Sequence, residues 1–318
     1  TVNIGVDFAL FRHRLSGTIE YYNKYSVDLL AAINGSPTQG FGYTTLMTNN
    51  GKMVNRGVEI TLSGEIIRQK DFSWNASLLY AFNRNKVKHI SVQPSLWDSR
   101  ISMPTSYPMV GKPLYGIYAY KWAGLNENGD PQVYDAENNV TSGPARDYHA
   151  LVYCGTTVPI HNASLTNVLR YKGFEFSAML ILDAGHKLRS SNIPSINMSN
   201  GRITSTAKGI VDRWTQPGDV TDVPRLLFSN DTENFNTHRT ELYRYSDLFV
   251  YDASNIRLSN ISLAYRVPAH WCKKISLSGA RLQFNVENVA TFAFDSKANY
   301  DLGGKVKPNY VWGLYLNF

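Results

Sequence analysis

The chain is dominated by segments in which apolar and polar side chains alternate. Near its start, Val2, Ile4, Val6 and Phe8 alternate with polar or small residues. A period of two places successive side chains on opposite faces of an extended strand. Nine such segments follow one another, at about residues 2–10, 15–22, 55–66, 72–82, 163–170, 174–183, 250–267, 281–287 and 310–318. The pattern predicts nine strands, each with one apolar and one polar face.

The seventh segment contains one break in the alternation. Its apolar positions change from Ile256 and Leu258 to Ile261, which is a slip of one residue at Ser259-Asn260. A β-bulge places one extra residue in a strand and produces this kind of slip. We therefore expect a bulge at this point.

The connections between the segments alternate between short and long. Short connections join the first and second, third and fourth, and fifth and sixth segments, and a modest one joins the seventh and eighth. The long connections cover residues 26–53, 85–159, 186–247 and 290–308. Transmembrane barrels sort their connections in this way, with tight periplasmic turns and long outer loops. The sequence predicts an all-β fold, part of an antiparallel transmembrane β-barrel whose C-terminus is periplasmic.

One long connection contains a helical pattern. Within residues 201–214, Ala207, Ile210, Val211 and Trp214 fall at the spacing of a helix face. This spacing predicts a short amphipathic helix that organises the loop.

Composition agrees with a membrane barrel. Charged residues make up 18% of the chain, below the roughly 25% of soluble domains, and aromatics make up 13%. No apolar run approaches the roughly 18–20 residues of a spanning helix. The net charge is +7, but lysines and arginines are scattered, which argues against nucleic-acid binding. The densest basic stretch, Arg84–His89, is interpreted as the solvated start of a loop.

Catalytic and metal-binding motifs are absent from the sequence. It has no Gly-x-Ser-x-Gly elbow, no His-x-x-x-His pair and no phosphate-binding glycine loop. Cys154 and Cys272 are interpreted as incidental. Residues 126–130 faintly resemble a calcium loop, but Pro131 stands where that loop needs glycine, so a simple turn is preferred. We expect no enzyme activity, no cofactor and no metal.

Several residue strings resemble those of SusC/RagA-type TonB-dependent outer-membrane receptors, and they occur in that family's order. They are Met53–Ile60, Tyr118–Leu125 followed by Gly129–Pro131, Tyr171–Phe176, Arg213–Arg225, Ser254–Leu258 and Asn285–Val289. Two departures stand out. Val286-Glu287 replaces the family's usual Gly-Gln, and the acidic signature that normally follows is reduced to Asp295 and Asp301.

The resemblance implies a nutrient importer of the Gram-negative outer membrane. Residues 1–318 would supply about nine strands and the long surface loops of a roughly 22-stranded plugged barrel, with the N-terminal plug domain outside this chain. The implied partners are a SusD-like surface lipoprotein, the TonB complex acting through the N-terminal part, outer-membrane lipid, and an oligosaccharide or peptide substrate.

Two sets of residues are candidates for function under this resemblance. Aromatic side chains in the long loops are candidates for ligand or partner contact, with loop packing as an equally good interpretation. These are Trp97, Tyr107, Tyr118, Tyr120, Trp122 and Tyr134. The chain ends on an aromatic residue after alternating apolar positions, a pattern that the resemblance links to barrel assembly. This set is Trp312, Leu314, Leu316 and Phe318.

Two alternatives stay open at this point. One is a passive porin or an adhesin-type barrel, which would lack an energised cycle. The other is a secreted, soluble β-sandwich that binds glycans and buries its apolar strand faces inward.

Overall fold

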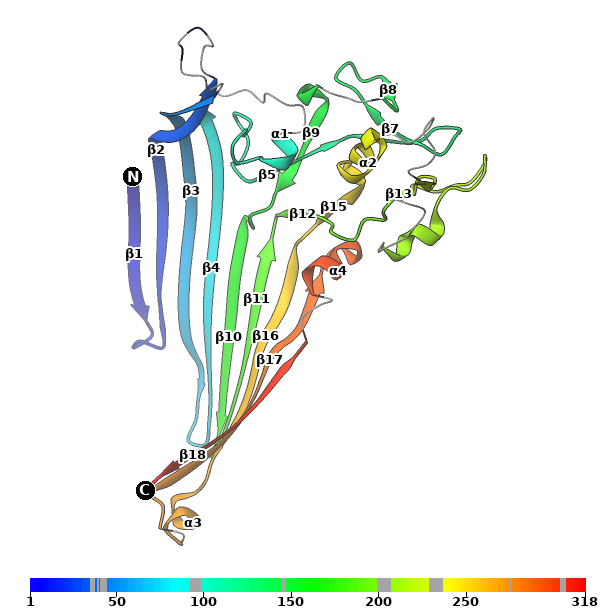
Figure 1. The fold of residues 1–318 in the computed structure, drawn as a ribbon. Helices are drawn as coiled ribbons and strands as arrows, with labels where there is room; N and C mark the ends of the chain where they lie inside the picture. The colour runs from blue at the N-terminus through cyan, green and yellow to red at the C-terminus, as the bar shows by residue number, and fades with distance from the viewer. Residues whose placement is uncertain are drawn as a thin grey trace.

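The computed structural model describes residues 1–34, 38, 40, 45–91, 99–143, 147–198, 207–228, 237–274, 276–303 and 307–318. Its main feature is one antiparallel sheet of nine long strands, which lie side by side in a single layer (Figure 1). The strands are β1 (Val2–Leu10), β2 (Leu15–Asn34), β3 (Thr45–Arg68), β4 (Phe72–His89), β10 (His161–Tyr171), β11 (Phe174–Ala184), β16 (Asn255–Arg266), β17 (Gly279–Ala293) and β18 (Asn309–Asn317).

These strands confirm the nine segments predicted from the alternating pattern. They follow one another across the sheet in chain order, with β1 and β18 at its two edges. The predicted bulge in the seventh segment is also confirmed. Asn260 and Leu258 of β16 pair with consecutive residues of β11, so Ser259 is the extra residue. The pairing of β16 with β17 shifts at the same position.

Three predicted boundaries are wrong. Most of residues 26–53 form the β2–β3 hairpin rather than a loop, because backbone pairing continues past bulges that disturb the alternation. Arg84–His89 belongs to β4 and is paired to β3, so it is not the start of a loop. The segment 250–267 is two strands, because β15 (Val250–Asp252) pairs with β12 (Lys187–Arg189) outside the main sheet.

One face of the sheet is apolar and exposed. The register places Leu78, Leu165 and Leu180 directly opposite one another on β4, β10 and β11. At the two edges of the sheet, Ile4 and Leu314 are each 62% exposed. No second sheet covers this face within the described chain, so the structure is not a β-sandwich. An apolar face of this size is suited to lipid rather than to water.

Asn167 is a polar residue on this apolar face. It lies between Ala76 and Ala178, and its side-chain oxygen accepts a hydrogen bond of 3.1 Å from the indole nitrogen of Trp74. A polar group in hydrocarbon costs free energy unless it is paired. The cross-strand bond from Trp74 therefore explains how the face tolerates an asparagine.

The opposite face of the sheet is polar and linked by hydrogen bonds. Glu175 accepts from Arg170 at 2.7 Å and from Arg281 at 3.1 Å, joining β10, β11 and β17. Asn162 donates to Asp183 at 2.7 Å. Such a face is compatible with the hydrated interior of a barrel.

The remaining elements gather mainly at one end of the sheet, whereas α3 and the C-terminus lie at the other end (Figure 1). We call residues 99–143, 147–160, 185–198, 207–228 and 237–254 the loop cap. Its elements are α1 (Ser99–Ser102), β5 (Gly116–Tyr120), β6 (Trp122–Leu125), β7 (Pro131–Tyr134), β8 (Val140–Thr141), η2 (Tyr148–Ala150), β9 (Leu151–Thr156), β12, β13 (Asn197–Met198), η3 (Lys208–Asp212), β14 (Leu227–Phe228), α2 (Thr237–Arg244), η4 (Asp247–Phe249) and β15. The others are α3 (Ala269–Lys274), η5 (Ser296–Ala298) and α4 (Asn299–Leu302).

The helix predicted within residues 201–214 is seen in part. Residues 201–206 lie outside the described residues, and the described part forms the short 3₁₀ helix η3. No helix of the described ranges is long and apolar enough to span a membrane.

Candidate functional site

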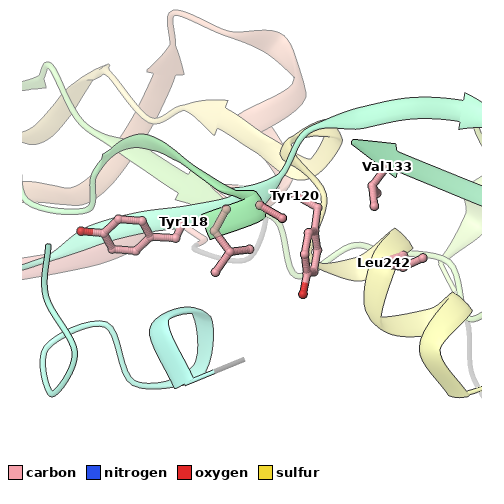
Figure 2. Close-up of a cluster of buried hydrophobic side chains, with 6 residues drawn as sticks. Tyr118, Tyr120, Val133 and Leu242 are labelled. Carbon is pink, nitrogen blue, oxygen red and sulfur yellow. The ribbon is translucent and has the colours of Figure 1, made fainter. Parts of the chain in front are cut away.

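The loop cap has a hydrophobic core of its own. Tyr118 and Tyr120 on β5 are almost completely buried beside Val133 and Leu242 (Figure 2). The Tyr118 hydroxyl accepts a hydrogen bond of 3.3 Å from the backbone nitrogen of Met109. Burial raises the pKa of Tyr118. These contacts make both tyrosines packing residues of the cap, which supports the loop-packing interpretation for them.

Arg189 fastens three segments of the cap to one another. Its guanidinium donates to the backbone oxygen of Tyr118 at 2.7 Å and to those of Arg244 and Ser246 at 3.2 Å. Burial lowers the pKa of Arg189. An arginine side chain stays protonated in proteins in spite of this shift. Its N–H groups here provide hydrogen bonds to backbone carbonyl groups of the cap, and buried carbonyl groups need such partners.

Asp130 is the centre of a second polar cluster. Arg225 binds its carboxylate with two hydrogen bonds, of 3.0 and 2.8 Å, and Arg239 donates to it at 3.1 Å. Arg239 also donates to the backbone oxygens of Ile196 and Arg225. Its side chain is 4% exposed, and burial lowers its pKa while Asp130 opposes that effect. One carboxylate therefore joins parts of the chain that are 95 and 109 residues away.

Trp214 packs on the turn that carries Asp130. The turn is closed by Asn126, whose side-chain oxygen accepts from the backbone nitrogens of Asn128 and Asp130. Gly129 has φ of +75° and lies directly against the indole of Trp214. The two strings that resemble receptor motifs, around residues 129–131 and 213–225, thus meet in space.

Replacing Gly129 with alanine is expected to loosen this turn. A non-glycine residue at positive φ costs roughly 1–3 kcal/mol, and a Cβ here would also clash with the Trp214 ring. Hydrogen–deuterium exchange of residues 124–134 in the full receptor measures the effect. Gly218→Ala is the matched control, because Gly218 has φ of +99° but open space around it. Equal exchange in the two variants would contradict a role for the Trp214 contact.

The cap is joined to the sheet at residues 185–187 and 252–254. Asp252 accepts from Lys187 at 3.0 Å and from the Ser254 backbone nitrogen at 2.8 Å. Burial alone would raise the pKa of Asp252, but the bonds from Ser254 and Lys187 outweigh it and lower the pKa to about 2. The Ser254 hydroxyl accepts from the Gly185 backbone nitrogen at 3.0 Å. The string Ser254–Leu258 therefore marks the point where β16 leaves the cap.

Asp301 ties the last long connection to the cap. It accepts hydrogen bonds from the hydroxyls of Ser190 and Ser191 at 2.7 and 2.6 Å, and from the Ser191 backbone nitrogen at 3.0 Å. The acidic residue singled out after the penultimate strand thus has a structural contact.

Trp122 is held by two carboxylates of the cap. Its indole nitrogen donates to Asp222 and its backbone nitrogen donates to Asp247, each at 2.9 Å. Its ring also lies 5.8 Å from that of Tyr243. Trp122 stays partly exposed.

The other predicted contact residues divide into two groups. Tyr107 and Tyr134 are partly exposed, and the Lys121 ammonium lies 4.7 Å from the centre of the Tyr134 ring. Trp97 lies outside the described residues. For Tyr107, Trp122 and Tyr134, contact with a ligand or partner stays a prediction.

The described residues include no group of three or more His, Cys, Asp or Glu side chains placed to hold a metal ion. At the turn that faintly resembles a calcium loop, Asp130 directs both carboxylate oxygens to arginines.

Burial raises the pKa of the Cys154 thiol to about 11. That value leaves almost no reactive thiolate at neutral pH.

Three residues of the C-terminal set, Trp312, Leu314 and Leu316, lie on the apolar face of the edge strand β18, and Phe318 directly follows the strand. Trp312 is 78% exposed and Phe318 is 91% exposed, and Leu314 and Leu316 continue the same row. The Trp312 ring packs on Phe284 of β17 with the ring centres 4.2 Å apart. Their role in assembly stays a prediction.

Sequence reasoning missed Asp130, Arg189 and Arg239 as organising residues. Single charged residues in long loops carry no periodic signal, and their partners are distant in the chain. Only the resemblance of the string around Gly129–Pro131 indicated that this turn matters.

Comparison with known proteins identifies related chains. A family model described as "TonB dependent receptor-like, beta-barrel" matches residues 1–289. TonB-dependent receptor P3 of Formosa agariphila is 25% identical over 335 residues, covering 98% of this chain and 32% of the relative. TonB-dependent receptor SusC of Bacteroides thetaiotaomicron is 24% identical over 302 residues, covering 91% of this chain and 28% of the relative.

Solved structures show the same fold. The structure of the RagAB peptide transporter matches with a TM-score of 0.74 at 22% identity, covering 99% of this chain and 35% of that chain. The RagAB peptide importer in its "open-open" state matches with a TM-score of 0.72 at 21% identity. This chain spans about a third or less of the curated relatives named above.

Proposed function

Because this chain belongs to the TonB-dependent receptor β-barrel family, we propose that it forms the barrel wall and surface loops of a TonB-dependent nutrient importer. The family indicates the Gram-negative outer membrane. The observation that carries the proposal is the sheet itself, with an exposed apolar face and a hydrogen-bonded polar face. In a barrel wall these faces contact lipid and the hydrated interior, respectively.

The nine strands form one sector of the barrel, and strands and a plug outside this chain complete it. Two points support this part of the proposal. First, β1 and β18 are edges of the sheet, and unpaired edges inside lipid are strongly unfavourable. Second, the relatives and the matching solved chains are about three times longer. The plug would occupy the barrel interior and connect it to the TonB complex.

We place the loop cap on the cell surface and the C-terminus in the periplasm. The asymmetry of the sheet supports this orientation, because long connections gather at one end and short turns at the other. A cap with its own packed core suits a role in docking a SusD-like lipoprotein and gating the substrate. The partly exposed aromatics Tyr107, Trp122 and Tyr134 are positioned to stack on a sugar ring or to contact a peptide.

The substrate that we propose is an oligosaccharide or a peptide. Both classes rest on the resemblance of the motifs to SusC/RagA-type receptors, and the matching solved structure is that of a peptide transporter. The experiment uses a host whose growth depends on the full receptor. Growth of this host on defined oligosaccharides is compared with its growth on peptide mixtures, and the carbon source that supports growth identifies the substrate class.

The test of the importer is uptake in that host. We expect uptake to be abolished without TonB, and the Trp122→Ala receptor to import several-fold less at equal abundance. Tyr115→Ala is the control, because Tyr115 is a surface aromatic outside the candidate set and is 50% exposed. Uptake that persists without TonB would replace the importer with a passive porin. Unchanged uptake by Trp122→Ala would remove that residue from the site.

A further inference from the structure

A cavity of about 570 Å³ lies where β4 continues beyond the end of its pairing with β10. It is bounded by the middle of β3, by the outer part of β4, by residues 111–113 and by a segment that runs from 153 to 160. Among the described residues that line it, every charged side chain is basic. The five cations are Arg56, Arg84, Lys86, Lys88 and Lys112, and we call the site the cationic cavity.

No carboxylate of the described residues neutralises these cations. None of the five forms an ion pair with a carboxylate anywhere in the described ranges. Arg56 donates to the neutral side chain of Asn23 at 3.2 Å, and the Lys112 ammonium lies 4.8 Å from the centre of the Tyr153 ring.

Two of the cations face each other directly. The β3–β4 register pairs Arg56 with Arg84, and both side chains are exposed on the same face. Like charges opposite each other in a sheet are destabilising. An anion bound between Arg56 and Arg84 would offset this repulsion, because each guanidinium would then donate a charge-assisted hydrogen bond to it.

The register places this pair on the face that contacts lipid. Val58 and Phe82 are the preceding cross-strand pair on that face, and His161 continues the row on β10. Lys86 follows Arg84 on the same face, opposite Val54. A substrate in the barrel interior therefore does not explain these three cations.

Their height matches the headgroup layer. The 11 residues of β10, at about 3.3 Å each and tilted by about 40°, span roughly 28 Å, close to the hydrocarbon thickness of about 30 Å. Arg84 comes two residues after Phe82, which is about 5 Å beyond the end of this pairing. That height falls within the polar layer, where phosphate groups of lipids lie.

The rest of the lining fits a lipid. Phe82, Val158 and Ile160 supply apolar surface next to the cations. A lipid presents apolar chains beside a charged headgroup, so both kinds of lining residue would have a partner.

We propose that the cationic cavity binds the phosphate groups of a lipid in the outer leaflet, through Arg56, Arg84 and Lys86. The proposal rests on the orientation given above, with the loop cap at the cell surface. The bound lipid would tie the rim of the barrel, where β4 and β10 separate, to the membrane that surrounds it.

The test measures binding of lipopolysaccharide to the full receptor in detergent, without TonB or substrate. We expect Arg84→Gln/Lys86→Gln to weaken binding at least tenfold. The matched control is Lys70→Gln/Lys172→Gln, which removes the same charge from exposed residues in short turns at the other end of the sheet and is expected to bind like wild type. Heat-modifiable migration on gels verifies that each variant is folded.

Three outcomes would overturn the proposal. Equal binding by Arg84→Gln/Lys86→Gln and wild type would remove the site. Lipopolysaccharide that has lost its phosphates to alkaline phosphatase could bind as tightly as the untreated form, and then phosphate would not be the recognised group. Inorganic phosphate at the same concentration as the lipopolysaccharide could displace it completely, and then the site would be one for free phosphate. Because uptake is not measured here, these failures are distinct from a failure of the importer proposal.

Discussion

Asp130→Asn is expected to destabilise the loop cap by about 3 kcal/mol. The substitution preserves the shape of the side chain but removes the charge that two arginines share, one of them 4% exposed. Breaking a buried ion pair by changing one partner typically costs about 3–5 kcal/mol, because a buried charge is left without compensation. We place this pair at the lower end, since the Asp130 side chain is 21% exposed.

Hydrogen–deuterium exchange of the full receptor measures this effect segment by segment. A cost of about 3 kcal/mol corresponds to roughly a hundredfold loss of protection. The loss is expected in the four segments that the cluster joins, around residues 130, 196, 225 and 239. Protection of the β10–β11 hairpin should not change.

The control for this experiment is Glu127→Gln. Glu127 is an exposed residue of the same turn and makes no ion pair among the described residues. The same charge change there should leave exchange unaltered. Equal protection in Asp130→Asn and wild type would show that the arginines are satisfied without the carboxylate.

Leu165→Arg is expected to lower severely the amount of folded receptor in the outer membrane. Leu165 lies near the middle of β10 on the apolar face, opposite Leu78 and Leu180. Arginine on the lipid face of a barrel near the bilayer midplane costs about 2–4 kcal/mol. The measurement is the fraction of heat-modifiable barrel in isolated outer membranes.

Thr166→Arg is the matched comparison on the next residue of the strand. Thr166 lies on the polar face, opposite Ser77 and Met179. We expect this variant to accumulate far better than Leu165→Arg, because a cation on that face meets the hydrated interior. A larger loss in Thr166→Arg than in Leu165→Arg would mean that the two faces have been assigned the wrong way round.

The strands and their faces could be predicted because alternation is a local property. Each strand of the β10–β11 hairpin carries its own two-residue period, and the short turn at Lys172-Gly173 joins them. The bulge at Ser259 was predictable for the same reason, since it shifts the phase of the pattern. Where bulges occur close together, as between Ser26 and Leu30 in β2, the phase is lost and the pattern predicts a loop in place of the strand.

The loop cap was not predictable in the same way. Its short strands carry too few residues to show a period, and its core tyrosines were candidates for ligand contact as much as for packing. Burial of Tyr118 and Tyr120 follows from contacts with α2 and β7, which come from other parts of the chain. The basic stretch Arg84–His89 is likewise visible in the composition, but the placement of Arg84 and Lys86 on the apolar face depends on the β3–β4 register.

The nine amphipathic strands, the order of short and long connections and the resemblance to the receptor family can therefore all be read from the chain alone. Which loop residues are buried and which charges are paired depends on the folded cap. The difference lies in how far apart in the sequence the interacting residues are. A strand face is set by neighbours two residues away, whereas the Asp130–Arg239 pair joins residues 109 apart and forms only when the whole cap is folded.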